Sequence, residues 1–189
     1  GFAMKKKGIF EGIKVADFSW YIVGPLTAKH FADFGATVVR IETTLNPDGL
    51  RRIGPWREGK WTGNLNRSGY WNEMNSSKYS VTINLTRPKG REIAYRFVKW
   101  ADIMVEGYTP GVMEKFGLDY ESVRKIKPDI IMVSSSGQGQ KGPHARHPLY
   151  GHIQLAISGV NHFVGWPDLA PVGPYGPWTD FYSPHITTA

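Results

Sequence analysis

The stretch from Gly12 to Glu42 constrains the fold most, because it predicts a strand, a tight turn, a helix and a second strand in direct succession. Val15–Phe18 is a short apolar run, as expected for a strand buried on both faces, and Thr37–Ile41 is expected to be the second buried strand. Gly24-Pro25 breaks the first run, Pro25 suits the first helical position, and Gly35 stands where a helix C-cap is expected. Two strands joined by one helix run parallel through a right-handed crossover.

The rest of the chain continues this alternation and predicts an α/β fold: a Rossmann-like open, mainly parallel sheet with flanking helices. Residues 43–69 lack periodicity and are predicted to have no regular structure. Ligands of such sheets bind beyond the carboxyl ends of the strands, which here are residues 19–24 and 42–45. Further strands are expected at 79–85, 102–106 and 129–133, and further helices at 88–100, 111–116, 119–127, 150–158 and from 179 onward.

Composition narrows the class of protein. The chain has 189 residues, of which 41% are hydrophobic, and it has no cysteine. The lack of cysteine excludes a disulfide scaffold, a thiolate zinc site and a cysteine nucleophile. No apolar run approaches the ~20 residues of a membrane span, and no signal peptide is recognisable. We therefore expect a cytoplasmic protein with no membrane partner.

The net charge of +7 favours an anionic partner, although a solvated basic surface explains it about equally well. The basic residues are dispersed and no nucleic-acid motif occurs, so we expect no nucleic-acid partner. A phosphorylated small molecule fits a parallel α/β sheet better.

Several familiar site motifs are absent. The first strand–helix turn lacks G-x-G-x-x-G, and the glycine-rich residues 134–142 lack the G-K-[ST] of a P-loop, so a flexible connector is favoured there. His144 and His147 fall in a loop, and Pro148 separates them from His152, which argues against a metal site. No G-x-S-x-G motif supports a serine triad.

Asp180 is the carboxylate that stands out, because it lies between Trp178 and Phe181-Tyr182. An acid among aromatic side chains is partly desolvated, which raises its pKa and favours a role as nucleophile. The alternative is a helix N-cap, since aspartate caps helices well. On these residues alone the cap is the favoured interpretation.

Five segments of the chain resemble the class III CoA-transferases, the family of formyl-CoA transferase, carnitine CoA-transferase and α-methylacyl-CoA racemase. They are VADFSWYIVGPLTAKHFADFGATVVRIE, NSSKYSVTINLTRPKGREI, ADIMVEGYTPGVMEKFGLDYESVRKIKPDIIMVSSSGQGQKGP, LYGHIQLAISG and WTDFYS. The resemblance implies a CoA-binding α/β domain over 12–189, preceded at 1–11 by a tag remnant and lead-in. Members of this family are typically about twice this length, so the chain resembles the N-terminal half of the family fold.

The resemblance implies that Asp180 is the catalytic nucleophile, which would carry the acyl group and then CoA as covalent aspartyl intermediates. CoA and acyl-CoA would be substrates, with no prosthetic group and no metal. Tyr150-Gly151 replaces the His-Asp pair of the racemase branch, so racemisation is not expected. Tyr150 is similar to the tyrosine of formyl-CoA-transferase-like members and could donate to a developing oxyanion.

Further site residues are implied by the same resemblance. Tyr70 and Trp71 are expected to shape the acyl pocket, and the aromatic density near them suggests a bulky or aromatic acid. Expected contacts to CoA are Tyr21, Ile22 and Val23 along the pantetheine, Thr43, Ile83, Gly107 and Tyr108 around the adenine, and Lys115 near the phosphates.

The expected partners are an acyl-CoA, a carboxylic acid and a second chain, in an interlocked homodimer or heterodimer. Two alternatives remain open. One is a lyase on the same scaffold, which forms the acyl-CoA and then eliminates a leaving group. The other is a non-catalytic CoA-binding subunit of a heteromeric transferase.

Overall fold

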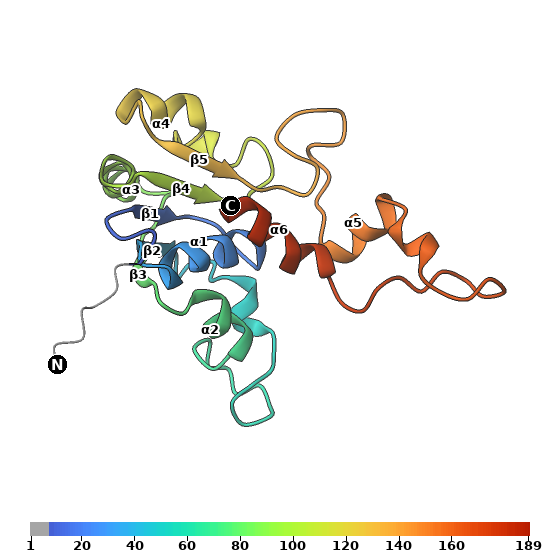
Figure 1. Ribbon diagram of the computed structural model, residues 1–189. Helices are drawn as coiled ribbons and strands as arrows, with labels where there is room; N and C mark the ends of the chain where they lie inside the picture. Colours follow the sequence, from blue (N-terminus) through green and yellow to red (C-terminus); the bar gives the residue numbers. More distant parts are fainter. Residues whose placement is uncertain (1–7) are drawn as a thin grey trace, which may run out of the picture.

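The computed structural model describes residues 8–189, so the part of the expected tag remnant at 1–7 lies outside the described residues. A five-stranded sheet with order β3-β2-β1-β4-β5 forms the centre, and all neighbouring strands pair in parallel (Figure 1). The predicted open parallel sheet is thereby confirmed. Its strands are β1 (Lys14–Asp17), β2 (Thr37–Glu42), β3 (Tyr79–Thr82), β4 (Ile103–Glu106) and β5 (Ile131–Ser134).

The strand order reverses between β1 and β4. After β1 the chain adds β2 and β3 on one side, and then crosses back to add β4 and β5 on the other side. At such a switch point the two following connections diverge, which opens a crevice beyond the carboxyl ends of the strands. The topology therefore places a ligand crevice at the turns after β1 and β4.

Alternate residues of the strands enter two separate cores. Ala16 of β1 packs in one buried cluster with Val98, on the face covered by α3 (Pro88–Trp100) and α4 (Tyr120–Ile126). Its neighbour Val15 packs with Phe31 on the opposite face, which α1 (Val23–Asp33) covers. Apolar residues on both faces explain why consecutive positions of these strands, such as Val15 and Ala16, are hydrophobic.

Most of the predicted helices form with small shifts at their ends, but the helix expected at 111–116 is only a three-residue 3-10 helix. Pro25 is the third residue of α1 rather than the first, because α1 already begins at Val23. Gly35 follows the C-cap with φ of 108°, a left-handed conformation that suits glycine. The remaining helical elements are α5 (Gly151–Ile157), α6 (Trp178–Thr188) and the short 3-10 helices η2 (Glu114–Phe116) and η3 (Val160–Phe163).

The prediction that residues 43–69 lack regular structure was wrong in part. The segment contains the 3-10 helix η1 (Gly49–Arg52) and leads into α2 (Gly69–Asn75). Asp48 caps η1 by accepting from the Leu50 N–H, and Ser68 caps α2 by accepting from the Trp71 N–H. These helices are too short to show a 3.6-residue period, so their caps were the available signal.

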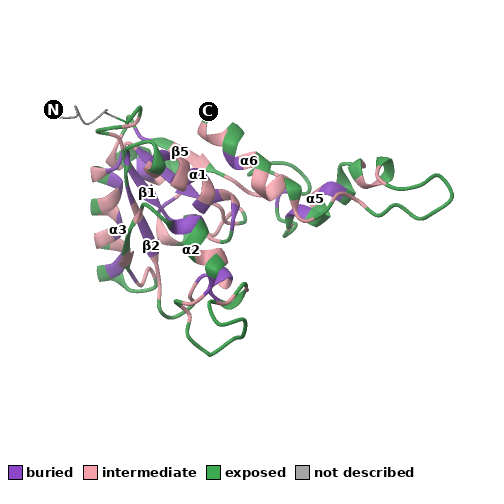
Figure 2. Cartoon of the chain, turned by 60° about the horizontal axis from the view of Figure 1, so that its bottom comes forward, coloured by how far each residue is buried: buried purple, intermediate pink, exposed green. Residues whose placement is uncertain are grey.

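The C-terminal part of the chain, residues 150–189, is organised differently from the sheet (Figure 1). Residues of α5, of η3 and of the following loop extend away from the body, and α6 returns to lie against α1. Most of this excursion is exposed, as Figure 2 shows. None of the helices in the described residues combines the length and the apolar character that a membrane span needs.

Candidate functional site

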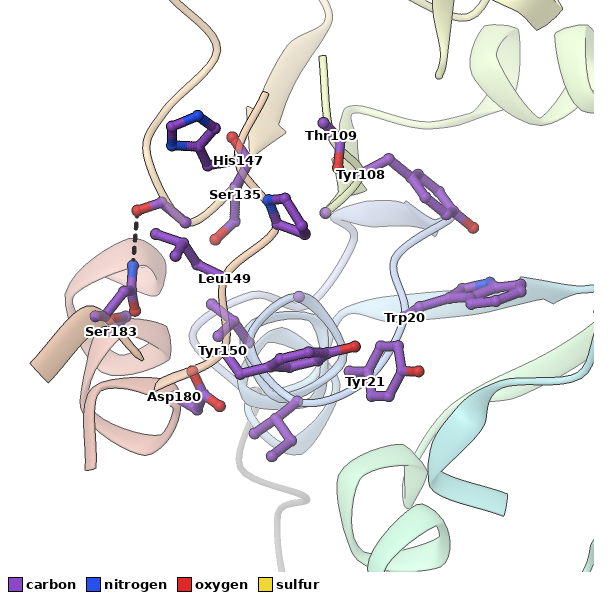
Figure 3. A pocket seen from close by; sticks show the side chains of 18 of the residues that line it. Trp20, Tyr21, Tyr108, Thr109, Ser135, His147, Leu149, Tyr150, Asp180 and Ser183 are labelled. Atoms are coloured by element: carbon purple, nitrogen blue, oxygen red, sulfur yellow. Dashed lines mark hydrogen bonds between the residues drawn. The ribbon is translucent and has the colours of Figure 1, made fainter. Parts of the chain in front are cut away.

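A cavity of about 280 Å³ occupies the expected crevice (Figure 3), and we call it the carboxylate cleft. Its walls come from the turns after β1 and β4, the loop after β5, and helices α5 and α6. Seven of the predicted site residues line it together: Tyr21, Ile22, Val23, Gly107, Tyr108, Tyr150 and Asp180. Residues from positions 21 and 180 thus meet in one site, although 159 positions separate them.

Asp180 lies in the first turn of α6, partly buried, but it does not cap that helix. The N-cap is Pro177, and Asp180 instead accepts a hydrogen bond from the Gly151 N–H at the start of α5, at 3.3 Å. The interpretation of Asp180 as a helix N-cap was therefore wrong. Burial raises the pKa of Asp180, while the Gly151 N–H and His152 oppose that rise. The carboxyl group is thus desolvated, as its aromatic surroundings predicted.

Gly151 allows Asp180 to approach the start of α5. A Cβ atom at Gly151 would lie 2.8 Å from Cγ of Asp180 and 2.8 Å from Cβ of Pro177. Such distances are too short for a real side chain, so glycine is required for this contact. The Thr179 hydroxyl adds a second link at 3.3 Å, by donating to the Gly151 carbonyl.

Two tyrosines stand beside the carboxylate. Tyr150 lies between Asp180 and Tyr21 in Figure 3, and the Tyr150 and Tyr21 rings meet edge to face at 5.8 Å. Tyr150 is 57% exposed, so its hydroxyl can reach a bound ligand. Burial raises the pKa of Tyr21, and contact with Tyr150 adds to that rise, so both its proton and its donor capacity are retained.

A second cavity, of about 310 Å³ and mainly apolar walls, adjoins the carboxylate cleft, and we call it the apolar hollow. Thr43 and Ile83 line it, as do the buried Phe18 and Met113. Trp20 and Tyr108 border both cavities, and their rings lie 5.8 Å apart. The two cavities therefore form adjacent parts of one elongated site.

Other predicted residues lie outside both cavities. Lys115 is exposed on η2, next to Phe116 of the apolar hollow. Tyr70 contacts Phe181, the neighbour of Asp180, with 6.2 Å between ring centroids. The guanidinium of Arg51 lies over the Trp71 ring, 3.5 Å from the ring centroid.

Several residues of the carboxylate cleft were not singled out from the sequence. Ser135, Ser136 and Gly137 come from the loop that had been interpreted as a flexible connector, and His147 follows in the same loop. The side chain of Gln154 on α5 holds this loop by donating to the Gly137 carbonyl at 2.8 Å. The available signal was their position directly after β5, at the carboxyl edge of the sheet.

The fold and the site define an open, doubly wound α/β protein with an acidic residue at its topological switch point. Residues 10–189 match the family model of CoA-transferase family III. The chain therefore belongs to CoA-transferase family III.

Known relatives agree with this assignment. The acetyl-CoA:oxalate CoA-transferase of Acetobacter aceti is 37% identical over 88% of this chain and 41% of its own length. The succinyl-CoA–L-malate CoA-transferase beta subunit of Chloroflexus aurantiacus is 34% identical over 86% of this chain and 39% of its own length. The crystal structure of a CAIB/BAIF family protein from Brucella suis, 28% identical, superposes with a TM-score of 0.87 over 97% of this chain and 48% of that one. The chain thus spans about two fifths of these curated relatives.

Proposed function

We propose that the protein carrying this chain transfers CoA from an acyl-CoA to a carboxylic acid, with Asp180 as the nucleophile. The observation that carries the proposal is the position of the Asp180 carboxylate, which is partly desolvated in the carboxylate cleft and oriented by the Gly151 N–H. Desolvation makes a carboxylate a stronger nucleophile, and an adjacent backbone donor fixes its direction.

The reaction proceeds by exchange at one carboxyl group. An oxygen of Asp180 attacks the thioester carbonyl, forming a mixed anhydride and releasing the CoA thiolate. The thiolate attacks the aspartyl carbonyl, which gives an aspartyl-CoA thioester and releases the donor acid as its carboxylate. The acceptor carboxylate then attacks that thioester, which forms a second mixed anhydride and releases the CoA thiolate again. The thiolate attacks the acceptor's carbonyl in this anhydride, which forms the new acyl-CoA and restores the Asp180 carboxylate. Tyr150 donates a hydrogen bond to the oxyanion of the tetrahedral states.

The two cavities suit the two ends of an acyl-CoA. In the proposal, pantetheine runs along Tyr21, Ile22 and Val23 in the carboxylate cleft, with Gly107 at the junction. The adenine occupies the apolar hollow between Tyr108, Thr43 and Ile83, and Lys115 pairs with the phosphates at its rim. Tyr70 and Trp71 lie outside both cavities but pack against the cluster that contains Ile22, as Phe181 does, and through it they shape the acyl end. The support is the common border formed by Trp20 and Tyr108.

The acceptor acid is proposed to be a small dicarboxylic acid. The two relatives named above act, by their names, on oxalate and on L-malate. The hydroxyl-bearing residues Ser135, Ser136 and Tyr150 line the cleft and suit a second polar group on the acid. A bulky aromatic acid, suggested by the aromatic residues near Trp71, is the competing choice. Turnover with oxalate, malate and phenylacetate as acceptors separates the two.

A non-catalytic role within a heteromer is the second candidate, because one relative is described as a beta subunit. The exposed apolar side chains of residues 150–189, among them Phe163 and Trp166, support a subunit contact in either a homodimer or a heterodimer. We propose the interlocked cytoplasmic dimer for both candidates. A lyase would be recognised by an eliminated product when the acid carries a β-substituent.

Trapping of the aspartyl thioester tests the proposal. The protein is incubated with acetyl-CoA or succinyl-CoA, treated with borohydride or hydroxylamine, digested and analysed by mass spectrometry. We expect the modification on the peptide that contains Asp180, and none when the Asp180→Ala variant is treated in the same way. Transfer of CoA without any label at Asp180 would remove this residue from the mechanism.

A further inference from the structure

Four buried charged side chains lie beneath the turn after β1, and the proposed chemistry uses none of them. The side chains of Asp17, Arg40, Asp48 and Lys78 are each at most 1% exposed. Asp17 accepts from Lys78 Nζ at 2.9 Å, and Arg40 Nη2 donates to Asp48 at 2.5 Å. Arg40 Nη1 lies 3.5 Å from Asp17, which joins the two pairs into one buried charge network.

Stability alone is a weak explanation for such a network. Burying ions costs desolvation free energy, and well-packed apolar residues in their place often give the same or a higher stability of the folded state. The useful question is therefore what the four groups hold in place. Three of them reach the backbone or side chains of the turn that leads into α1, which forms one wall of the carboxylate cleft.

The contacts to that turn are specific. Asp17 accepts from the backbone N–H of Ser19 at 3.0 Å, and Arg40 Nη1 donates to the Ser19 carbonyl. Asp48 accepts from the Tyr21 N–H at 3.2 Å. One guanidinium therefore bridges the Ser19 carbonyl and the carboxylate that binds Tyr21, through two different nitrogen atoms held in a rigid fork.

Tyr21 needs such a support because its backbone is left-handed, with φ of 61°. Within the described residues, only Tyr21 and Ser77 among non-glycine residues have a positive φ, and Ser77 directly precedes Lys78 of the network. A bulky residue keeps this conformation only where its surroundings impose it. The same conformation turns the Tyr21 ring against Gly49, where a Cβ would lie 2.6 Å from the Tyr21 hydroxyl oxygen, and against Tyr150.

We infer that Asp48 and Arg40 are positioning residues, which hold Tyr21 in its left-handed conformation and so place its ring beside Tyr150 in the carboxylate cleft. For its catalytic meaning this inference rests on the proposed function. Its structural content, the dependence of the Tyr21 backbone on Asp48, stands independently of any activity.

Hydrogen exchange tests the structural content. In an Asp48→Ala variant, the Tyr21 amide should exchange faster by on the order of tenfold, the equivalent of one lost hydrogen bond. Asp119→Ala is the matched control, because Asp119 also caps a short helix, accepting from Ser122 N at 3.1 Å, but makes its side-chain hydrogen bonds to Ser122 and not to Tyr21. Unchanged protection of Tyr21 in Asp48→Ala would overturn the inference. If that variant does not fold, Arg40→Lys, which keeps the charge and loses the fork, replaces it with the same expected result.

A double-mutant cycle on kcat/KM tests the catalytic content. Asp48→Ala should lower kcat/KM by about tenfold or more in the parent protein, because small displacements at a site are costly. In a Tyr21→Gly background the same change should have an effect within about twofold, since glycine adopts φ > 0 unaided and has no ring to place. Asp48→Asn, which retains an acceptor oxygen, should recover most of the loss. Equal losses in both backgrounds would refute the positioning role. If the parent transfers no CoA but Tyr21 exchange responds as expected, the proposed function fails and the positioning of Tyr21 stands.

Discussion

The apolar hollow and the carboxylate cleft adjoin each other but are built in different ways. The hollow is backed by the sheet core, where Ile83 and Met113 are at most 5% exposed. The cleft depends on the excursion that carries α5 and α6, where Tyr150 is 57% exposed and the link between the two helices is made by Asp180 and Gly151. On this comparison, the proposed binding of CoA and the proposed chemistry at Asp180 should respond to different substitutions.

The largest expected effect is a loss of CoA transfer with little change in the affinity for CoA. Asp180→Ala should lower CoA transfer by at least about 1,000-fold, as removal of a nucleophile does. The affinity for CoA, measured by calorimetry, should change only a few-fold, since the apolar hollow is untouched. Asp168→Ala, an exposed aspartate of the same excursion, is the control and should keep full activity. More than a tenth of the activity in Asp180→Ala would contradict the assignment.

The next effect concerns stability and compares the two regions directly. Leu118 is fully buried in the same cluster as Met113, so Leu118→Ala should lower the free energy of unfolding by ~2–5 kcal/mol. Phe163 on the excursion is 86% exposed within one chain, so Phe163→Ala, measured on the monomer, should change this free energy by no more than about 0.5 kcal/mol. Urea denaturation measures both. A comparable loss in Phe163→Ala would mean that the excursion is packed in solution.

Gly151→Ala tests whether the position of the Asp180 carboxylate matters for CoA transfer, because this variant keeps the carboxylate but displaces it. The added methyl group would meet Asp180 at 2.8 Å, which displaces the carboxylate and weakens the hydrogen bond from residue 151. Displacements of about 1 Å can cost about 100-fold in rate. We expect kcat to fall by that order while the affinity for CoA changes little. The melting temperature should also fall, because the methyl group meets Pro177 as well. An unchanged kcat would show that the contact between Gly151 and Asp180 is not needed for transfer.

The smallest effect lies on the binding side of the comparison. If the Tyr108 ring packs against adenine, Tyr108→Ala should weaken CoA binding by ~1 kcal/mol or more, judged from aromatic pair energies. Tyr79→Ala, at the exposed edge of the sheet and outside both cavities, is the control and should bind normally. Calorimetric titration with CoA measures the affinity of both variants. An unchanged affinity in Tyr108→Ala would refute the placement of adenine against Tyr108.

The sheet could be predicted because burial on both faces leaves a simple mark on the sequence. Val15 and Ala16 pack in opposite cores, so the two middle positions of the strand are both apolar and the strand can be recognised from the sequence. The sequence predicted which strands are neighbours only for the first parallel pair, β1 and β2. The placement of β4 next to β1 depends on contacts between distant segments, which no local pattern reports.

The candidate site was predictable in part. Asp180 stood out by its aromatic neighbours, but its hydrogen bond to Gly151 joins residues 29 positions apart and has no local signature. The same is true of Asp48, whose partners Tyr21 and Arg40 lie on other elements. The roles of Thr43 and Lys115 in binding CoA came from the resemblance alone and remain predictions.

The ring pair of Trp20 and Tyr108 has a practical consequence. Since these side chains border both cavities, an elongated ligand divided at its middle would yield two fragments, each with a compartment of its own. An adenine-bearing fragment and a short acid should then inhibit together without competing, and a linker passing the two rings should convert weak fragments into a tight bisubstrate inhibitor.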